Sequence, residues 1–178
     1  MYCSELKIPE KRVAVLIGKK GSTKDLIQKQ TKTKIDISKE GDIMIQSEDG
    51  LNCFIASNII KSIGRGFNPD IAITLLDEEN HFELINIADV AGRSQKKLRR
   101  IKARVIGREG KARKLLERLT KCHISVYGKT VCIIGPVESC ILAKQAIEKL
   151  LKGSKHGNVY KFLEKSKKRI EKEEFLNE

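Results

Sequence analysis

The stretch Ile17-Gly18-Lys19-Lys20-Gly21 returns 89 residues later as Ile106-Gly107-Arg108-Glu109-Gly110. The correspondence extends without a gap from residues 17–37 to residues 106–126, and seven of the paired positions are identical. A repeat of this length predicts that each copy is one structural unit of the same architecture. The chain is therefore expected to contain two similar domains, over residues 1–79 and 80–178.

Hydrophobic spacing predicts the elements of each copy. Alternating apolar residues predict a strand before each loop, at residues 13–17 and 101–105. A helix follows the loop, then a hairpin with glycine in its turn, then a longer amphipathic helix that ends at glycine. The predicted order is β, α, α, β, β, α in both copies, with an appended helix at 70–76 and again at 159–170. A strand at 81–87 is expected to connect the copies and to pack them together.

Composition limits the class of protein. The chain has 178 residues, 40% hydrophobic and 33% charged, which is enough to bury a core in two small domains. Its net charge of +13 favours a polyanionic partner such as nucleic acid. No apolar run reaches the length of a membrane span, and no signal peptide precedes residue 10, so we expect a soluble, cytoplasmic protein without a membrane partner.

The five cysteines and the scarce histidines give no sign of a metal site. No two cysteines have C-x-x-C spacing, and Cys132 and Cys140 lie in apolar stripes, so buried thiols are expected. His123 and the other two histidines are isolated from any nucleophile pattern, and no paired acidic clusters are present. We therefore expect neither an enzyme nor a cofactor or metal.

A β-α-α-β-β-α unit with a Gly-x-x-Gly loop between its first two helices resembles a type I KH domain, so the fold class expected is α+β with two tandem KH domains. In that family the loop clamps the backbone of about four nucleotides against an aliphatic groove. The residues expected to bind RNA are Gly18, Lys19, Lys20, Gly21, Lys24, Lys102, Arg104, Gly107, Arg108, Glu109, Gly110, Lys111, Arg113 and Lys114. The residues expected to line the hydrophobic grooves are Ile17, Ile27, Ile35, Ile37, Ile106, Leu116, Ile124 and Val126.

The second loop departs from the usual basic pair, because Glu109 places a carboxylate where a phosphate would approach. Its surroundings compensate, since residues 97–121 contain eleven basic and two acidic side chains. Aromatic residues make up only 4% of the chain, which excludes base stacking on aromatic rings as the main binding mode. We interpret the basic window as a phosphate-binding surface.

Three segments outside the loops, at residues 66–76, 82–90 and 151–160, are similar to the partner-of-Nob (Dim two) ribosome-assembly family. Both glycine pairs are kept, as in the archaeal form. The resemblance implies a non-enzymatic factor that binds the 3′ region of small-subunit ribosomal RNA during maturation. It also implies contact with the Nob endonuclease and, in archaea, with the alpha subunit of translation initiation factor two.

Residue patterns alone leave the RNA target open. Our hypothesis is that two linked phosphate clamps hold one single-stranded rRNA segment, and that linkage raises affinity over that of either unit. A general KH regulator of other RNAs would carry the same loops without preference for the rRNA 3′ end. A ribonuclease, in contrast, would cleave the RNA on addition of a divalent metal. The role of the basic segment 165–169 also stays open.

Overall fold

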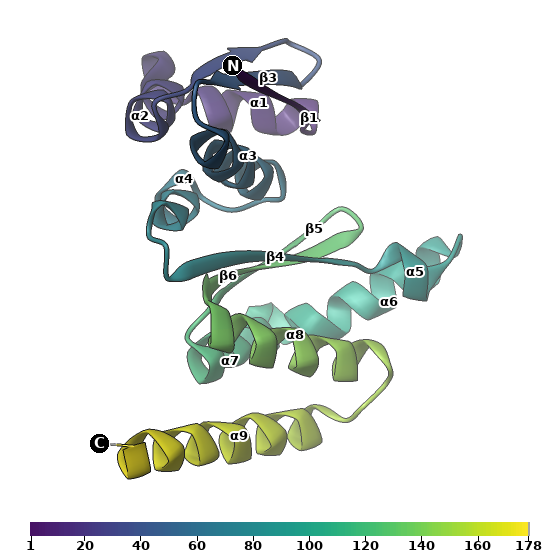
Figure 1. Cartoon of the computed structure of the whole chain (residues 1–178). Helices are drawn as coiled ribbons and strands as arrows, with labels where there is room; N and C mark the ends of the chain where they lie inside the picture. The colour runs from purple at the N-terminus through teal and green to yellow at the C-terminus, as the bar shows by residue number, and fades with distance from the viewer. Residues whose placement is uncertain (178) are drawn as a thin grey trace. The chain divides into compact units, whose positions relative to one another are not determined.

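A computed structural model describes residues 1–177 and contains two compact units, Met1–Phe82 and the part of the chain from Glu83 onward. Each unit has a three-stranded sheet with helices packed against it (Figure 1). This is the α+β architecture predicted from the repeat, with two KH units in one chain.

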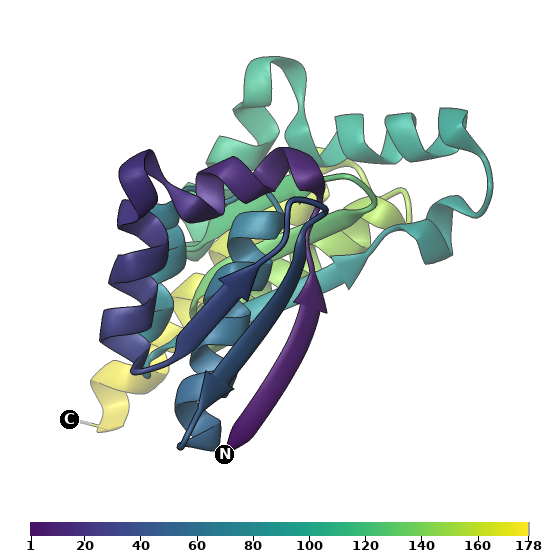
Figure 2. The same ribbon diagram turned by 90° about the horizontal axis from the view of Figure 1, so that it is seen from above.

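The first unit has a sheet in the order β1-β3-β2, in which both pairs are antiparallel. Figure 2 shows β1 at the edge of this sheet beside β3. The strands alternate exposed and buried residues, and the buried residues include Ile35 and Ile45. The elements are β1 (Tyr2–Lys7), α1 (Glu10–Ile17), η1 (Lys19–Gly21), α2 (Ser22–Thr31), β2 (Lys34–Ile37), β3 (Asp42–Ser47), α3 (Gly50–Gly64), α4 (Pro69–Ala72) and η2 (Ile73–Leu76).

The second unit repeats this order, with a sheet in the order β4-β6-β5. Its core lies between the sheet and the helices and includes Val105, Leu116 and Ile147. The elements are β4 (Asn80–Asn86), α5 (Ala88–Ala91), α6 (Gln95–Ile106), η3 (Arg108–Gly110), α7 (Lys111–Thr120), β5 (His123–Tyr127), β6 (Thr130–Pro136), α8 (Val137–Leu151) and α9 (His156–Asn177).

The strands predicted at residues 13–17 and 101–105 are wrong, because these residues form the ends of helices α1 and α6. The residues that α6 buries are Leu98, Ile101 and Val105, spaced three and four apart as on one face of a helix. A window of five residues is too short to separate this period from alternation. The true first strands are β1 and β4, which precede these helices.

The segment at 81–87 forms a strand, as predicted, but its assignment as a connecting element is corrected. Strand β4 hydrogen-bonds to β6 and is the first strand of the second sheet. The helix predicted at 70–76 is present as the short α4 followed by the 3-10 turn η2, and the one predicted at 159–170 is the longer α9. Asn80, at the start of β4, donates its side-chain amide to the carbonyl of Thr74 at 3.0 Å, which ties the strand to the preceding turn.

Candidate nucleic-acid interface

The first glycine of each Gly-x-x-Gly loop has a backbone that other residues do not adopt. Gly18 has φ 75° and ψ 177°, and Gly107 has φ 74° and ψ 175°. A Cβ at Gly18 would lie 2.3 Å from Oγ1 of Thr23, and one at Gly107 would lie 2.6 Å from Cβ of Ala112. Glycine is therefore required at both positions for two reasons: the backbone has a positive φ, and a Cβ atom would collide with the following helix.

The remaining loop residues also repeat each other. Lys20 and Glu109 hold the same left-handed conformation, with φ 55° and 54°. The second glycines, Gly21 and Gly110, also have positive φ, but a Cβ there would make only one contact at 3.5 Å with Asp25 in the first unit and none within 4 Å in the second. The loops are thus one backbone shape built twice, open on the side of the second glycine.

Each loop delivers the chain directly into a helix that lacks an N-terminal cap. Helices α2 and α7 begin at Ser22 and Lys111, and no side chain accepts a hydrogen bond from their first turns. Up to four amide N–H groups in a first turn have no partner within a helix. Such amides, together with the helix dipole, favour an anion, and phosphate is the anion that a nucleic acid supplies.

The charges around the two loops are arranged differently. In the first unit Lys19 and Lys20 are exposed and Lys24 is half-buried, while Asp25 is the one acid. The carboxylate of Asp25 lies close to Gly21, on the side where the loop is open. One acidic side chain therefore sits among three cations in this unit.

In the second unit the acid is in the loop itself. Glu109 is exposed and lies 3.8 Å from Nζ of Lys111, which is also exposed. Arg108 and Lys114 are exposed, and Arg113 is half-buried. Cations therefore outnumber the carboxylate four to one in residues 107–114.

Arg113 has a donor without a partner. Its Nε atom is buried and makes no hydrogen bond, although Oε2 of Glu117 lies 3.9 Å away. The other oxygen of Glu117 accepts from the amide of Ile124 at 2.8 Å, as Oε1 of Gln28 does from Ile35 in the first unit. These helix-to-strand bonds were not predicted; the aligned Gln28 and Glu117 of the repeat are the signal that could have found them.

Four of the eight residues predicted to line aliphatic grooves are core residues. Each has at most 2% of its surface exposed, because it faces the inside of its unit: Ile27, Ile35, Leu116 and Ile124. The other four are partly exposed and stay candidates for a groove: Ile17, Ile37, Ile106 and Val126. In each unit one of these partly exposed residues, Ile17 or Ile106, lies just before the glycine loop. The other, Ile37 or Val126, lies on the strand that follows α2 or α7.

Arg104, predicted to contact RNA, has a structural use. Its guanidinium donates to the carbonyls of Leu150 at 3.2 Å and Ser154 at 2.5 Å, where helix α8 ends. Arg12 does the same in the first unit, donating to Ile63 at 2.8 Å and Phe67 at 2.7 Å. Each arginine adds a charged donor at the C-terminal end of a helix, where the carbonyls of Ile63 and Leu150 also accept from backbone amides. Lys102, on the same helix as Arg104, is half-buried.

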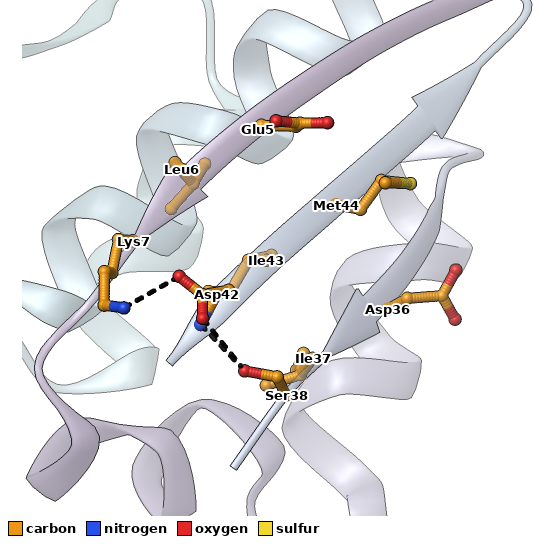
Figure 3. A pocket seen from close by; sticks show the side chains of 9 residues that line it. All are labelled: Glu5, Leu6, Lys7, Asp36, Ile37, Ser38, Asp42, Ile43 and Met44. Atoms are coloured by element: carbon orange, nitrogen blue, oxygen red, sulfur yellow. Dashed lines mark hydrogen bonds and ion pairs between the residues drawn. The ribbon is translucent and has the colours of Figure 1, made fainter. Parts of the chain in front are cut away.

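A hollow of about 750 Å³ lies on the first unit, away from the glycine loop (Figure 3). Glu5 and Asp36 flank the exposed Met44, and Asp42 pairs with Lys7 at 2.9 Å and accepts from Ser38 at 3.5 Å. Three carboxylates against one ammonium repel a phosphate. The hollow is therefore unfavourable for a phosphate, although Ile37, a groove candidate, is among its lining residues.

Four of the five cysteines are buried, including Cys132 and Cys140 as predicted, and Cys3 is exposed. A hydrogen bond between Cys122 and Cys140 lowers the pKa of Cys122 and raises that of Cys140, which burial raises further. Within residues 1–177, no group of three or more histidine, cysteine, aspartate or glutamate side chains is placed to hold a metal ion. In the same part of the chain, none of the helices combines the length and hydropathy needed to cross a membrane.

Comparisons with known proteins agree with this geometry. Residues 81–168 match the model of a eukaryotic-type KH domain, KH type I, defined on the second KH domain of PNO1, and residues 4–62 match the general KH domain model. A KH domain-containing protein of Methanocaldococcus jannaschii is 45% identical, over 96% of this chain and 76% of the relative.

A solved structure and a eukaryotic protein are also similar. The Pyrococcus horikoshii Dim2p structure, from a complex of a/eIF2alpha, Dim2p and rRNA, has a TM-score of 0.86 and 46% identity, covering 94% of this chain and 95% of that chain. The pre-rRNA-processing protein PNO1 of Coccidioides immitis is 30% identical over 58% of this chain, but this covers only 41% of the relative.

Proposed function

Because the chain belongs to the archaeal branch of the PNO1 (Dim2) family of tandem KH-domain proteins, we propose that it binds single-stranded RNA as a small-subunit ribosome biogenesis factor. The RNA site proposed is the 3′ region of small-subunit rRNA. The observation that supports this proposal most is the duplicated loop, with the same backbone conformation at both glycine pairs. The related Dim2p from P. horikoshii, solved in a complex with rRNA, supports the class of ligand.

The mechanism follows from the loop and the helix behind it. A phosphate approaches the open side of Gly110, where nothing lies within 4 Å of a Cβ position, or that of Gly21, where the Asp25 carboxylate is the one neighbour. The positive end of the α2 or α7 dipole, which no side chain caps, attracts its oxygens, and Lys19, Lys20 or Arg108 adds positive charge. Bases then face the partly exposed aliphatic residues beside the loop, without aromatic stacking.

The protein acts by binding and positioning RNA rather than by cleaving it. Both units match models of KH domains, a class of RNA-binding module, and this match supports binding as the role of the chain. The chemistry of maturation then falls to a partner. We include the Nob endonuclease and the alpha subunit of translation initiation factor two among the proposed partners; the second is supported by the complex that contains the related Dim2p.

The test is binding of the purified chain to a labelled oligonucleotide of the small-subunit rRNA 3′ end and to a scrambled strand, at several salt concentrations. We expect a preference for the rRNA strand that survives moderate salt. Equal and steeply salt-sensitive binding would support a general KH regulator instead, and cleavage of the strand on addition of Mg²⁺ would support a ribonuclease.

Charge reversal in the loops tests the site itself. Lys19→Asp with Lys20→Asp, and separately Arg108→Asp, should each weaken binding without loss of fold, because the three side chains are exposed. Reversal of the exposed Lys161 and Lys172 on α9, outside the segment 165–169, is the matched control for net charge. A loop variant that binds no more weakly than this control would remove that loop from the interface.

A further inference from the structure

A basic ridge lies on helix α6, at the start of the basic window, and it consists of Lys96, Lys97, Arg99 and Arg100, none of which is among the residues individually expected to bind RNA. All four side chains are exposed. Helix α6 has no acidic residue, and in the described part of the chain these four make no ion pair within 4.0 Å. Four positive charges therefore stand together without compensation.

Half of the ridge is an addition to the repeat. Helix α1 of the first unit has 8 residues and carries Glu10 in its first turn, whereas α6 has 12 residues and no acid there. The extra length lies at the N-terminal end of α6 and contains Lys96 and Lys97, whereas Arg99 and Arg100 align with Glu10 and Lys11. Helix α1 therefore has one basic residue at these positions where α6 has four, so the shared KH fold does not require the ridge.

The position of these charges opposes helix stability. Lys96 and Lys97 lie in the first turn of α6, next to the positive end of the helix dipole, where acidic residues are favourable and basic residues are not. Side chains that lower the stability of their own helix and make no ion pair are typical of a binding surface.

The ridge leads into the second glycine loop. Residues spaced three or four apart share a face of a helix, so Lys96, Arg100 and Ala103 form a row that continues to Gly107. The opposite face is buried through Leu98, among others. At 1.5 Å per residue the row is about 16 Å long, which spans about five phosphates at the roughly 3.4 Å spacing of a stacked strand.

We propose that the basic ridge binds the phosphate backbone of the RNA beyond the nucleotides that the second loop clamps. This inference rests on the proposed function. The ridge has no aromatic residue, so it contacts the backbone without reading sequence. Figure 1 shows α6 running from α5 toward α7, with which it flanks the loop.

The experiment compares a 6-nucleotide with a 14-nucleotide strand that extends past the clamped segment on both sides. It uses the full chain with Lys19→Asp and Lys20→Asp, so that the second loop dominates. The ridge variant changes all four residues to alanine. We expect it to bind the short strand as its parent does, and the long strand about 10- to 100-fold more weakly at low salt, for about three lost phosphate contacts.

Salt dependence gives a second readout. The slope of log affinity against log salt for the long strand should fall by about 2, because each phosphate contact to a single strand contributes about 0.7. The matched α9 control changes Lys152, Lys155, Lys161 and Lys172 to alanine, which removes the same charge from exposed positions on α9 and before it, outside the segment 165–169. It should keep the slope.

Three results would overturn the inference. They are an unchanged affinity of the ridge variant for the long strand, an equal loss in the α9 control, and an equal loss for the short strand. Failure of the proposed function looks different, because Arg108→Asp would then leave binding of the short strand unchanged.

Discussion

The two glycines of each loop are predicted to differ sharply in their tolerance of a methyl group. In the second loop, Gly107→Ala places Cβ 2.6 Å from Cβ and 2.7 Å from the amide nitrogen of Ala112, both far inside van der Waals contact. Gly107 also has a backbone that costs other residues about 1–3 kcal/mol, and overpacking adds about 1–3 kcal/mol. The free energy of unfolding is therefore expected to fall by about 2–6 kcal/mol.

Gly110→Ala meets nothing within 4 Å and carries only the cost of a left-handed residue, about 1–2 kcal/mol. For a unit of this size, a loss of about 1 kcal/mol lowers the unfolding temperature by about 4–8 °C. At the middle of each range, about 4 kcal/mol for Gly107→Ala and about 1.5 kcal/mol for Gly110→Ala, the unfolding transition of the second unit should fall by about 24 °C and about 9 °C. Calorimetry of the full chain measures both.

The first unit supplies the internal control, because it should unfold as in the parent chain. Equal losses of stability in Gly107→Ala and Gly110→Ala would show that the close approach of Gly107 to Ala112 does not determine which residue the loop accepts. A substitution of the first glycine would destabilise the unit and so confuse a binding assay. Charge reversal of the exposed residues between the two glycines tests RNA binding without this effect on the fold.

Four further outcomes are expected. Arg104→Ala should destabilise the second unit by about 2–4 kcal/mol, because two carbonyls near the end of α8 lose a charged donor. The control Lys102→Ala should have little effect on the free energy of unfolding. Similar losses of stability in the two variants would contradict a structural role for Arg104. Glu109→Gln should strengthen RNA binding about threefold, as expected for removal of one carboxylate about 6 Å from a phosphate in water, and weaker binding would refute this. The hydrogen bond to Glu83 at 2.6 Å raises the pKa of Lys144. The free energy of unfolding that this pair contributes should be complete below pH about 10.4, the pKa of an unfolded lysine, and should be lost as the pH rises through the raised pKa. In urea titrations at alkaline pH, Glu83→Gln should abolish this dependence of stability on pH. A thiol reagent should modify Cys3 quickly in the folded protein and the other four cysteines only after unfolding, and rapid reaction of a second thiol would contradict their burial.

The repeat predicted the fold class because both of its copies preserve the residues that shape the chain. Gly18 and Gly107 are needed at the same backbone angles, and the same spacing of apolar residues follows each. The similarity of the two loops, rather than composition, therefore predicted the fold class. The resemblance to the ribosome-assembly family agreed with this fold class, and it suggested ribosomal RNA as the specific RNA partner.

The errors have local physical causes. The apolar residues of 13–17 alternate over too few positions to separate a strand from the helix they form. Ile27 and Leu116 were assigned to grooves because an apolar side chain beside a loop can face either a ligand or the core, and only the packing decides. The pattern of charge does not show that two carbonyls near the end of α8 lie within reach of Arg104, and contact of this residue with RNA stays a prediction.

The most direct test of the central claim is an amide NMR titration of the full chain with an oligonucleotide of the small-subunit rRNA 3′ end. We expect the largest chemical-shift changes at the amides of residues 18–24 and 107–114, because the two loops and the two uncapped helix starts are the proposed phosphate-binding sites. Shifts confined to other surfaces, with both loops unchanged at saturation, would contradict it.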